Sequence, residues 1–196
     1  MGSFLKLLTA LAPLVVASPW DHSLRRWDTS ACTSASTSDS FSWPIDNLTY
    51  HLSEIYTTPA HLVASATLDF KIGNPALPSS PVVHCYAYSS AYSLYFYGQI
   101  TYACDDVSLA GSATKTYFTV SLINDELTVN QTWTCPQDAY TATFKGYGST
   151  ILPLDCHTTY YVNPNYTSPS SGFYSTRTTT CVPLTFTLTP SEKEVA

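Results

Sequence analysis

Alternation of apolar and polar residues is the dominant pattern of the chain from about residue 41 onward. In residues 62–72 every second side chain is apolar, and polar side chains occupy the positions between them. A period of two is typical of a β-strand with one buried face. The same period recurs in residues 94–104, 117–122, 127–135 and 182–189. Many short strands of this kind predict an all-β fold, a compact antiparallel β-barrel or sandwich.

Residues 157–180 do not alternate, and we expect a long loop there. Long loops are uncommon in compact domains and are usually functional or disordered. Tyrosine offers a flat apolar ring with a polar tip, which suits sugars, phenolic rings or protein partners. The candidate ligand-binding residues of this loop are Tyr160, Tyr161, Tyr166, Phe173 and Tyr174. The alternative, that these aromatic residues serve the fold alone, stays open. Helical periodicity is weak after the first residues, and only residues 50–56 could hold a helical turn.

The start of the chain is typical of a secretory signal peptide. Lys6 precedes an apolar run over residues 7–16, and the small residue Ala17 follows, so we expect residues 1–17 to be removed. The run is shorter than the roughly 20 apolar residues that span a bilayer. Arg25 and Arg26 form a dibasic pair directly behind this signal. We expect residues 18–26 to be a propeptide that is cut after this pair, leaving residue 27 as the mature N-terminus.

The remaining chain is expected to form one domain. Residues 27–40 are rich in serine and threonine, and we interpret them as a flexible tether or an O-glycosylated segment. Residues 41–190 form the single β domain, which is long enough to bury a real core, and residues 191–196 are a C-terminal tail.

Cysteines and glycosylation sequons agree with an extracellular location. An even number of cysteines, six, predicts a disulfide framework in an oxidising compartment, although sequence alone cannot choose among fifteen connectivities. Three sequons are present, at Asn47, Asn130 and Asn165. Asn130 falls on the strand face opposite Trp133, where a glycan would stand in solvent. We therefore expect a secreted glycoprotein.

Charge and motifs exclude several classes of function. The net charge of −6 disfavours nucleic acid as a partner, and no second apolar stretch could enter a membrane. Five scattered histidines have no metal-like spacing, and no catalytic motif is present, so we expect no metal, no cofactor and no enzyme activity. An undetected hydrolase using Asp105, Asp106 and Asp155 is the least favoured alternative.

Several segments together resemble the fungal Alternaria major-allergen family. The segments are "RRWDTSAC", "SFSWPIDNLTYH", "ATLDFKIGNPAL", "VHCYAYSS", "YACDD", "LTVNQTWTC" and "FKGYGSTILPLDC", and the likeness covers residues 28–156. The family comprises small secreted proteins, including elicitors of plant hypersensitive responses. The resemblance implies a compact antiparallel β-barrel without a catalytic site, acting at the interface between fungus and host.

The resemblance also implies how the cysteines are used. It suggests that Cys85 pairs with Cys104 and that Cys135 pairs with Cys156. Cys32 stands where some members link two subunits, which implies a homodimer, but this chain adds Cys181. A Cys32–Cys181 bridge would join both ends of the domain and remove that dimer.

The expected function is therefore binding without catalysis. The favoured interpretation is an effector-like or elicitor-like protein that binds an extracellular host protein or a small phenolic ligand. The alternative is a cell-wall or carbohydrate-binding protein that uses a tyrosine-rich surface.

Overall fold

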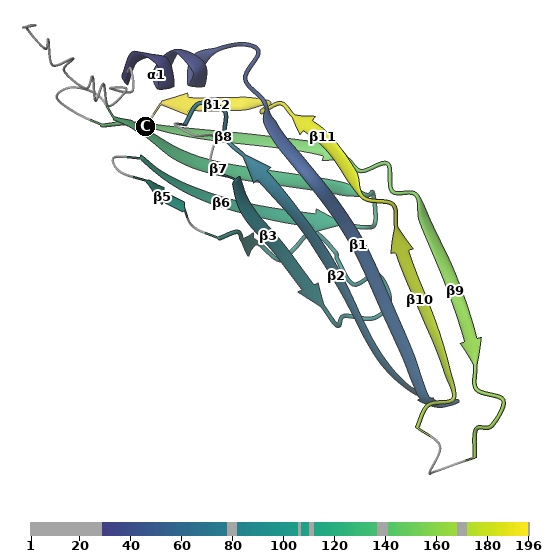
Figure 1. Ribbon diagram of the computed structural model, residues 1–196. Helices are drawn as coiled ribbons and strands as arrows, with labels where there is room; N and C mark the ends of the chain where they lie inside the picture. Colours follow the sequence, from purple (N-terminus) through teal and green to yellow (C-terminus); the bar gives the residue numbers. More distant parts are fainter. Residues whose placement is uncertain are drawn as a thin grey trace, which may run out of the picture.

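The computed structural model describes residues 29–77, 82–105, 107–109, 112–136, 141–167 and 172–195. The signal peptide, the propeptide and the Arg25-Arg26 pair lie outside these residues and stay predictions. Within the described chain, two six-stranded antiparallel sheets lie face to face (Figure 1). The predicted all-β fold is confirmed, and it takes the form of a sandwich, because the described strands do not join into a closed barrel.

The first sheet is built around one long strand. Its strand order is β3-β2-β1-β10-β9, and β11 pairs with the first part of β1. Asn47, with a φ of 53°, lies at a bulge where β1 passes from β11 to β10 as its partner. The strands of this sheet are β1 (Trp43–Thr58), β2 (His61–Gly73), β3 (Val82–Ser89), β9 (Cys156–Val162), β10 (Ser175–Cys181) and β11 (Leu184–Leu188). Residues 50–56 thus belong to a strand, and the helical turn considered for them is wrong.

The second sheet has the order β12-β8-β7-β6-β4, with β5 beside β6. Its central strand β7 has the predicted alternation, so that Trp133 is buried and Asn130 is exposed on the opposite face. The strands of this sheet are β4 (Tyr102–Ala103), β5 (Val107–Leu109), β6 (Ser112–Ser121), β7 (Glu126–Pro136), β8 (Thr141–Ile151) and β12 (Glu192–Val195).

Aromatic residues from both sheets fill the core. The Trp43 and Trp133 rings meet edge to face at 6.4 Å, and Phe70 meets Phe118 in the same way at 5.0 Å. Gly146 of β8 makes room for the first pair, since a Cβ atom there would lie 2.7 Å from Trp43 Cζ2. At this position β8 contributes backbone rather than a side chain to the core.

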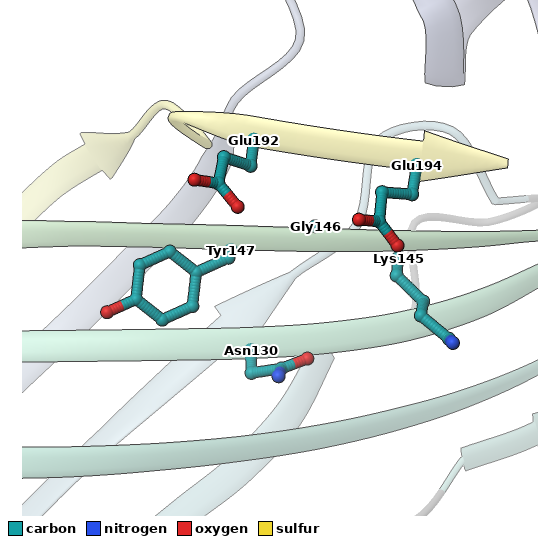
Figure 2. A pocket seen from close by; sticks show the side chains of 6 residues that line it. All are labelled: Asn130, Lys145, Gly146, Tyr147, Glu192 and Glu194. Atoms are coloured by element: carbon teal, nitrogen blue, oxygen red, sulfur yellow. The ribbon is translucent and has the colours of Figure 1, made fainter.

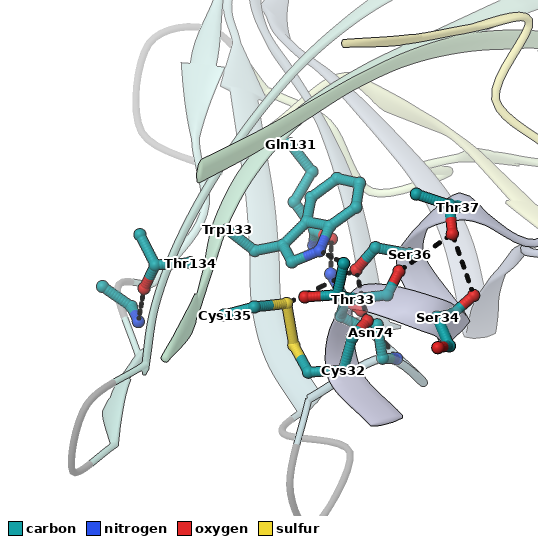
Figure 3. Close-up of a disulfide and its surroundings, with 12 residues drawn as sticks. Cys32, Thr33, Ser34, Ser36, Thr37, Asn74, Gln131, Trp133, Thr134 and Cys135 are labelled. Atoms are coloured by element: carbon teal, nitrogen blue, oxygen red, sulfur yellow. Dashed lines mark hydrogen bonds between the residues drawn. A yellow bond between two sulfur atoms is a disulfide. The ribbon is translucent and has the colours of Figure 1, made fainter. Parts of the chain in front are cut away.

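The serine- and threonine-rich segment is not a tether, because residues Thr29–Thr37 form helix α1. Cys32 of this helix is bonded to Cys135 of β7 (Figure 3). The Trp133 Nε1–H group donates a hydrogen bond of 2.8 Å to Ser36 Oγ, which in turn donates to the Cys32 carbonyl. Because serine and threonine are weak helix formers, these tertiary contacts, rather than local propensity, hold the helix.

The strand expected over residues 94–104 is also wrong. Only Tyr102–Ala103 is a strand there, and Tyr97 forms an isolated bridge with Ser121. The consecutive residues Tyr95 and Phe96 are both buried, which a strand with one buried face does not allow. Tyr95 reaches this position with a φ of 66°. The segment folds instead as an irregular cover over the inner face of the first sheet, where Phe96 meets Tyr50 at 6.3 Å.

The disulfides correct two of the three expected pairs. Cys85–Cys104 is confirmed, whereas Cys135 pairs with Cys32 and Cys156 pairs with Cys181. Strand register explains this result, because Cys156 and Cys181 face each other directly across β9 and β10. The expected Cys135–Cys156 and Cys32–Cys181 bridges are therefore wrong. With Cys32 bonded within its own chain, the sulfur expected to link two subunits is already engaged.

Candidate functional site

The β9–β10 hairpin occupies the stretch for which a long loop was expected. The two strands run antiparallel from the Cys156–Cys181 pair to the pair of Val162 and Ser175, so the expected loop is wrong for residues 157–162 and 175–180. β10 continues the sheet beside the second half of β1, and β9 lies outside it as the edge strand. In Figure 1 this hairpin extends at the lower right, together with the far ends of β1 and β2, past the strands of the second sheet.

Strand β9 is exposed along nearly its whole length. None of its residues is buried, and Tyr160, Tyr161 and Val162 are 72%, 52% and 60% exposed. Edge strands are usually protected by charged residues or proline, because their backbone groups can pair with another chain. Residues Cys156–Val162 contain no proline, lysine, arginine, aspartate or glutamate. An uncharged, aromatic edge of this kind is suited to pairing with a strand of another protein.

The structure brings the five predicted aromatic residues to this hairpin, but not into one cage. Tyr161 and Phe173 contact each other with ring centroids 5.9 Å apart, and Tyr166 meets Tyr174 edge to face at 5.4 Å. Tyr160 lies apart from both pairs, with its ring 5.9 Å from the Arg177 guanidinium. Because Tyr160 and Tyr161 are successive residues of one strand, they point to opposite faces of the sheet, so the five side chains do not form a single surface.

An ion pair between a buried carboxylate and a half-exposed arginine holds the hairpin against β1. Glu54, which is 2% exposed, accepts a hydrogen bond of 3.0 Å from Arg177 Nη1 and one of 2.8 Å from the Tyr95 hydroxyl. Burial first, and then the Glu54 carboxylate, raise the pKa of Tyr50 to about 12, and Arg177 opposes this rise. Burial followed by the hydrogen bond to Glu54 also raises the pKa of Tyr95. Burial lowers the pKa of Arg177, but Glu54 and Tyr160 more than offset this effect, so it stays protonated.

The sequence analysis does not identify Glu54 or Arg177 as members of an ion pair. A signal was nevertheless present, because Glu54 falls on the apolar face of an alternating segment that includes Tyr50 and Leu52. A charged residue on a buried face needs a partner of opposite charge. The partner could not be found from the sequence, since Arg177 lies 123 positions further along the chain.

The remaining predicted site residues lie elsewhere. The sequon residues Asn47, Asn130 and Asn165 are all exposed, so none is barred by burial from carrying a glycan, and their occupancy stays a prediction. Of the candidate hydrolase carboxylates, Asp105 and Asp155 are exposed and Asp106 lies outside the described residues. Among described residues, no helix is long and apolar enough to cross a membrane.

These features define a class of protein: an antiparallel β-sandwich joined by three internal disulfides, with an exposed aromatic edge strand. The family model described as Alternaria alternata allergen 1 matches residues 45–181, and the chain belongs to this family. The match includes β9 and β10, which lie beyond the residues that carry the resemblance seen in the sequence. No curated protein and no solved structure matches the chain.

Proposed function

We propose that the protein is a secreted, effector-like or elicitor-like member of the allergen family, which binds an extracellular host protein and has no catalytic activity. The observation that carries the proposal is the exposed, uncharged edge of β9, with Tyr160, Tyr161 and Val162 in solvent. Three disulfides within the chain fit an oxidising extracellular location. A host protein that offers an extended segment could add a strand beside β9.

The test combines capture with a cell response. Purified secreted protein is applied to leaf tissue, the response is scored, and extracellular proteins that co-purify are identified. Tyr161→Lys places a charge on the β9 edge and should abolish both the capture and the response. Tyr88→Lys is the matched control, because Tyr88 is 54% exposed on β3 at the opposite edge of the same sheet. Equal behaviour of the two variants would refute the assignment to β9, and no captured protein and no response with the unmodified protein would refute the function.

The second candidate, binding of a glycan or a small phenolic ligand, rests on a different contact. The Tyr160 ring lies over Arg177, whose side chain is 41% exposed, so an aromatic face and a cation are both open to solvent. Retention on chitin, glucan or cellulose that is lost in Tyr160→Ala would favour a carbohydrate ligand. Quenching of tyrosine fluorescence by a flavonoid, again lost in Tyr160→Ala, would favour a phenolic ligand.

A further inference from the structure

The outer face of the second sheet holds Asn130 between two tyrosines. Strand register places Tyr117 of β6 opposite Asn130 of β7, and Asn130 opposite Tyr147 of β8. Residues directly opposite on neighbouring strands have Cβ atoms about 4.5–5.5 Å apart. Both tyrosines are 43% exposed, so their rings border the asparagine without being covered by the fold.

The same face is hollowed around this asparagine. A hollow of about 220 Å³ is lined by Asn130, Lys145, Gly146, Tyr147, Glu192 and Glu194 (Figure 2). A second one, of about 350 Å³, lies on the side of Tyr117 and shares Asn130 and Tyr147 with the first. Asn130 therefore stands in the middle of a shallow groove that continues on both of its sides.

We propose that Asn130 carries an N-linked glycan whose first N-acetylglucosamine packs between the rings of Tyr117 and Tyr147. The transfer forms a bond from Asn130 Nδ2 to C1 of the sugar. It breaks the bond from C1 to the pyrophosphate of a lipid-linked oligosaccharide donor, and one amide proton leaves to the base of the transferase. The C–H faces of the sugar then cover the tyrosine rings, which are flat and apolar.

Polar groups at the rim suit the rest of such a sugar. Thr119 and Thr128 line the groove on one side, and Glu192 of β12 lines it on the other. Their hydroxyl and carboxylate oxygens can accept hydrogen bonds from sugar hydroxyls. The groove thus combines two aromatic walls with polar ends, so it offers partners for both the apolar face and the hydroxyls of a sugar ring.

The other two sequons lack this setting. Asn47 lies at the bulge of β1, where register gives it no directly opposite residue on β2 or β11. Asn165 follows β9 in a turn and has no cross-strand neighbour. Of the three sequons, Asn130 alone has an aromatic residue opposite it on both neighbouring strands. A glycan there is part of the packing of the second sheet and leaves the β9–β10 hairpin of the first sheet open.

The test uses full-length protein secreted from yeast, which attaches high-mannose glycans. Mass spectrometry measures the occupancy of Asn130, and endoglycosidase H trims these glycans to one N-acetylglucosamine. We expect occupancy, and we expect the trimmed protein to keep its thermal midpoint. Thr132→Ala, which removes the sequon and keeps Asn130, should lower Tm by about 2–4 °C, the shift expected for one stacking contact in a protein of this size.

A double-mutant comparison separates stacking from other effects of the sugar. In a Tyr117→Ala/Tyr147→Ala background, adding Thr132→Ala should change Tm by less than about 1 °C. Both tyrosines are on the surface, so these variants leave the core intact, and the single tyrosine variants replace the double one if it is poorly secreted. Thr49→Ala, which removes the Asn47 sequon, is the matched control and should leave Tm unchanged. An Asn130 that carries no glycan, or an unchanged Tm in Thr132→Ala, would overturn the proposal. So would a decrease in Tm on Thr132→Ala that is as large in the Tyr117→Ala/Tyr147→Ala background as in the unmodified protein.

Discussion

Arg177→Met should destabilise the protein more than Glu54→Gln, although both variants break the same ion pair. The two partners differ in burial, because the Glu54 side chain is 2% exposed and the Arg177 side chain is 41% exposed. Without the arginine, the carboxylate keeps one hydrogen bond, from the Tyr95 hydroxyl, and has no opposite charge. Removing one partner of a buried pair costs about 3–5 kcal/mol, and the half-exposed arginine places this loss near the lower limit, at about 3 kcal/mol.

Two further variants, Glu54→Gln and Glu54→Met/Arg177→Met, are compared with Arg177→Met. Glu54→Gln preserves size and one of the two acceptor oxygens, and the arginine that loses its counter-charge can reach water, so the expected loss is about 1 kcal/mol. Glu54→Met/Arg177→Met removes both charges, and its stability should stay within about 1 kcal/mol of the unmodified protein. The ion pair is thus expected to affect stability mainly because loss of one partner leaves the charge of the other unpaired.

Urea unfolding with the disulfides intact, followed by circular dichroism, measures these differences. The double variant identifies the cause, because it removes both charges together. Equal losses for the two single variants, or a loss in Glu54→Met/Arg177→Met as large as that in Arg177→Met, would refute the reasoning.

Three further variants test other parts of the structure. Replacing Cys32 and Cys135 by serine opens a loop of 103 residues. It should cost about 4.7 kcal/mol in the chain-entropy model, measured by urea unfolding, and release α1, detected by hydrogen exchange. Tyr50→Phe should weaken the alkaline loss of stability: with its pKa raised to about 12, the contribution of Tyr50 is present below about pH 10 and is lost between about pH 10 and 12. Over this pH range the unmodified protein should lose about 2–3 kcal/mol more free energy of unfolding than Tyr50→Phe, measured by circular dichroism. Gly146→Ala places a Cβ atom 2.7 Å from Trp43 Cζ2 and should cost about 1–3 kcal/mol in urea unfolding.

Each of these expectations has a result that contradicts it. Hydrogen exchange in α1 that matches the unmodified protein would show that the helix docks without its disulfide. An alkaline transition in Tyr50→Phe that coincides with that of the control Tyr86→Phe, an exposed residue of β3, would remove the linkage argument. Unchanged stability in Gly146→Ala would mean that the indole of Trp43 can move aside.

The sequence predicted several of the strands that have one buried face, although β1 and β3, which also alternate, were not among them. β2, β6 and β7 show the period of two because one side of each lies on the core and the other lies in water. β8 was not predicted because glycines, Gly146 and Gly148, occupy two of its buried positions, so its sequence shows no apolar alternation there. The neighbouring Trp43 ring lies where their side chains would be. Helix α1 was not predicted for another reason: it is stabilised by the Cys32–Cys135 disulfide and by the hydrogen bond between Trp133 and Ser36, rather than by local helix propensity.

The sequence did not predict the β9–β10 hairpin because β9 does not pack against a second layer of the fold. β9 has no buried residue, so nothing in its sequence forces an apolar face, and no alternation appears. A two-stranded ribbon of this kind is marginally stable at best in water, and burial cannot supply what is missing. The structure uses other contacts: β10 pairs with β1, the Glu54–Arg177 pair ties the two strands, and the Cys156–Cys181 disulfide joins β9 to β10.

The Cys156–Cys181 disulfide stabilises the hairpin in place of a hydrophobic core, so the aromatic side chains of the hairpin do not have to be buried. The disulfide directly joins the first residue of β9 to the last residue of β10, so the hairpin keeps its register without burying its aromatic residues. Tyr160 and Tyr161 can then remain in solvent at little cost in stability. The combination of an ordered strand, an uncharged edge and exposed tyrosines fits the proposed role of β9 as a surface for a partner. The same features recur on β3, at the other edge of the sheet, and the comparison of Tyr161→Lys with Tyr88→Lys therefore decides whether β9 is the edge that is used.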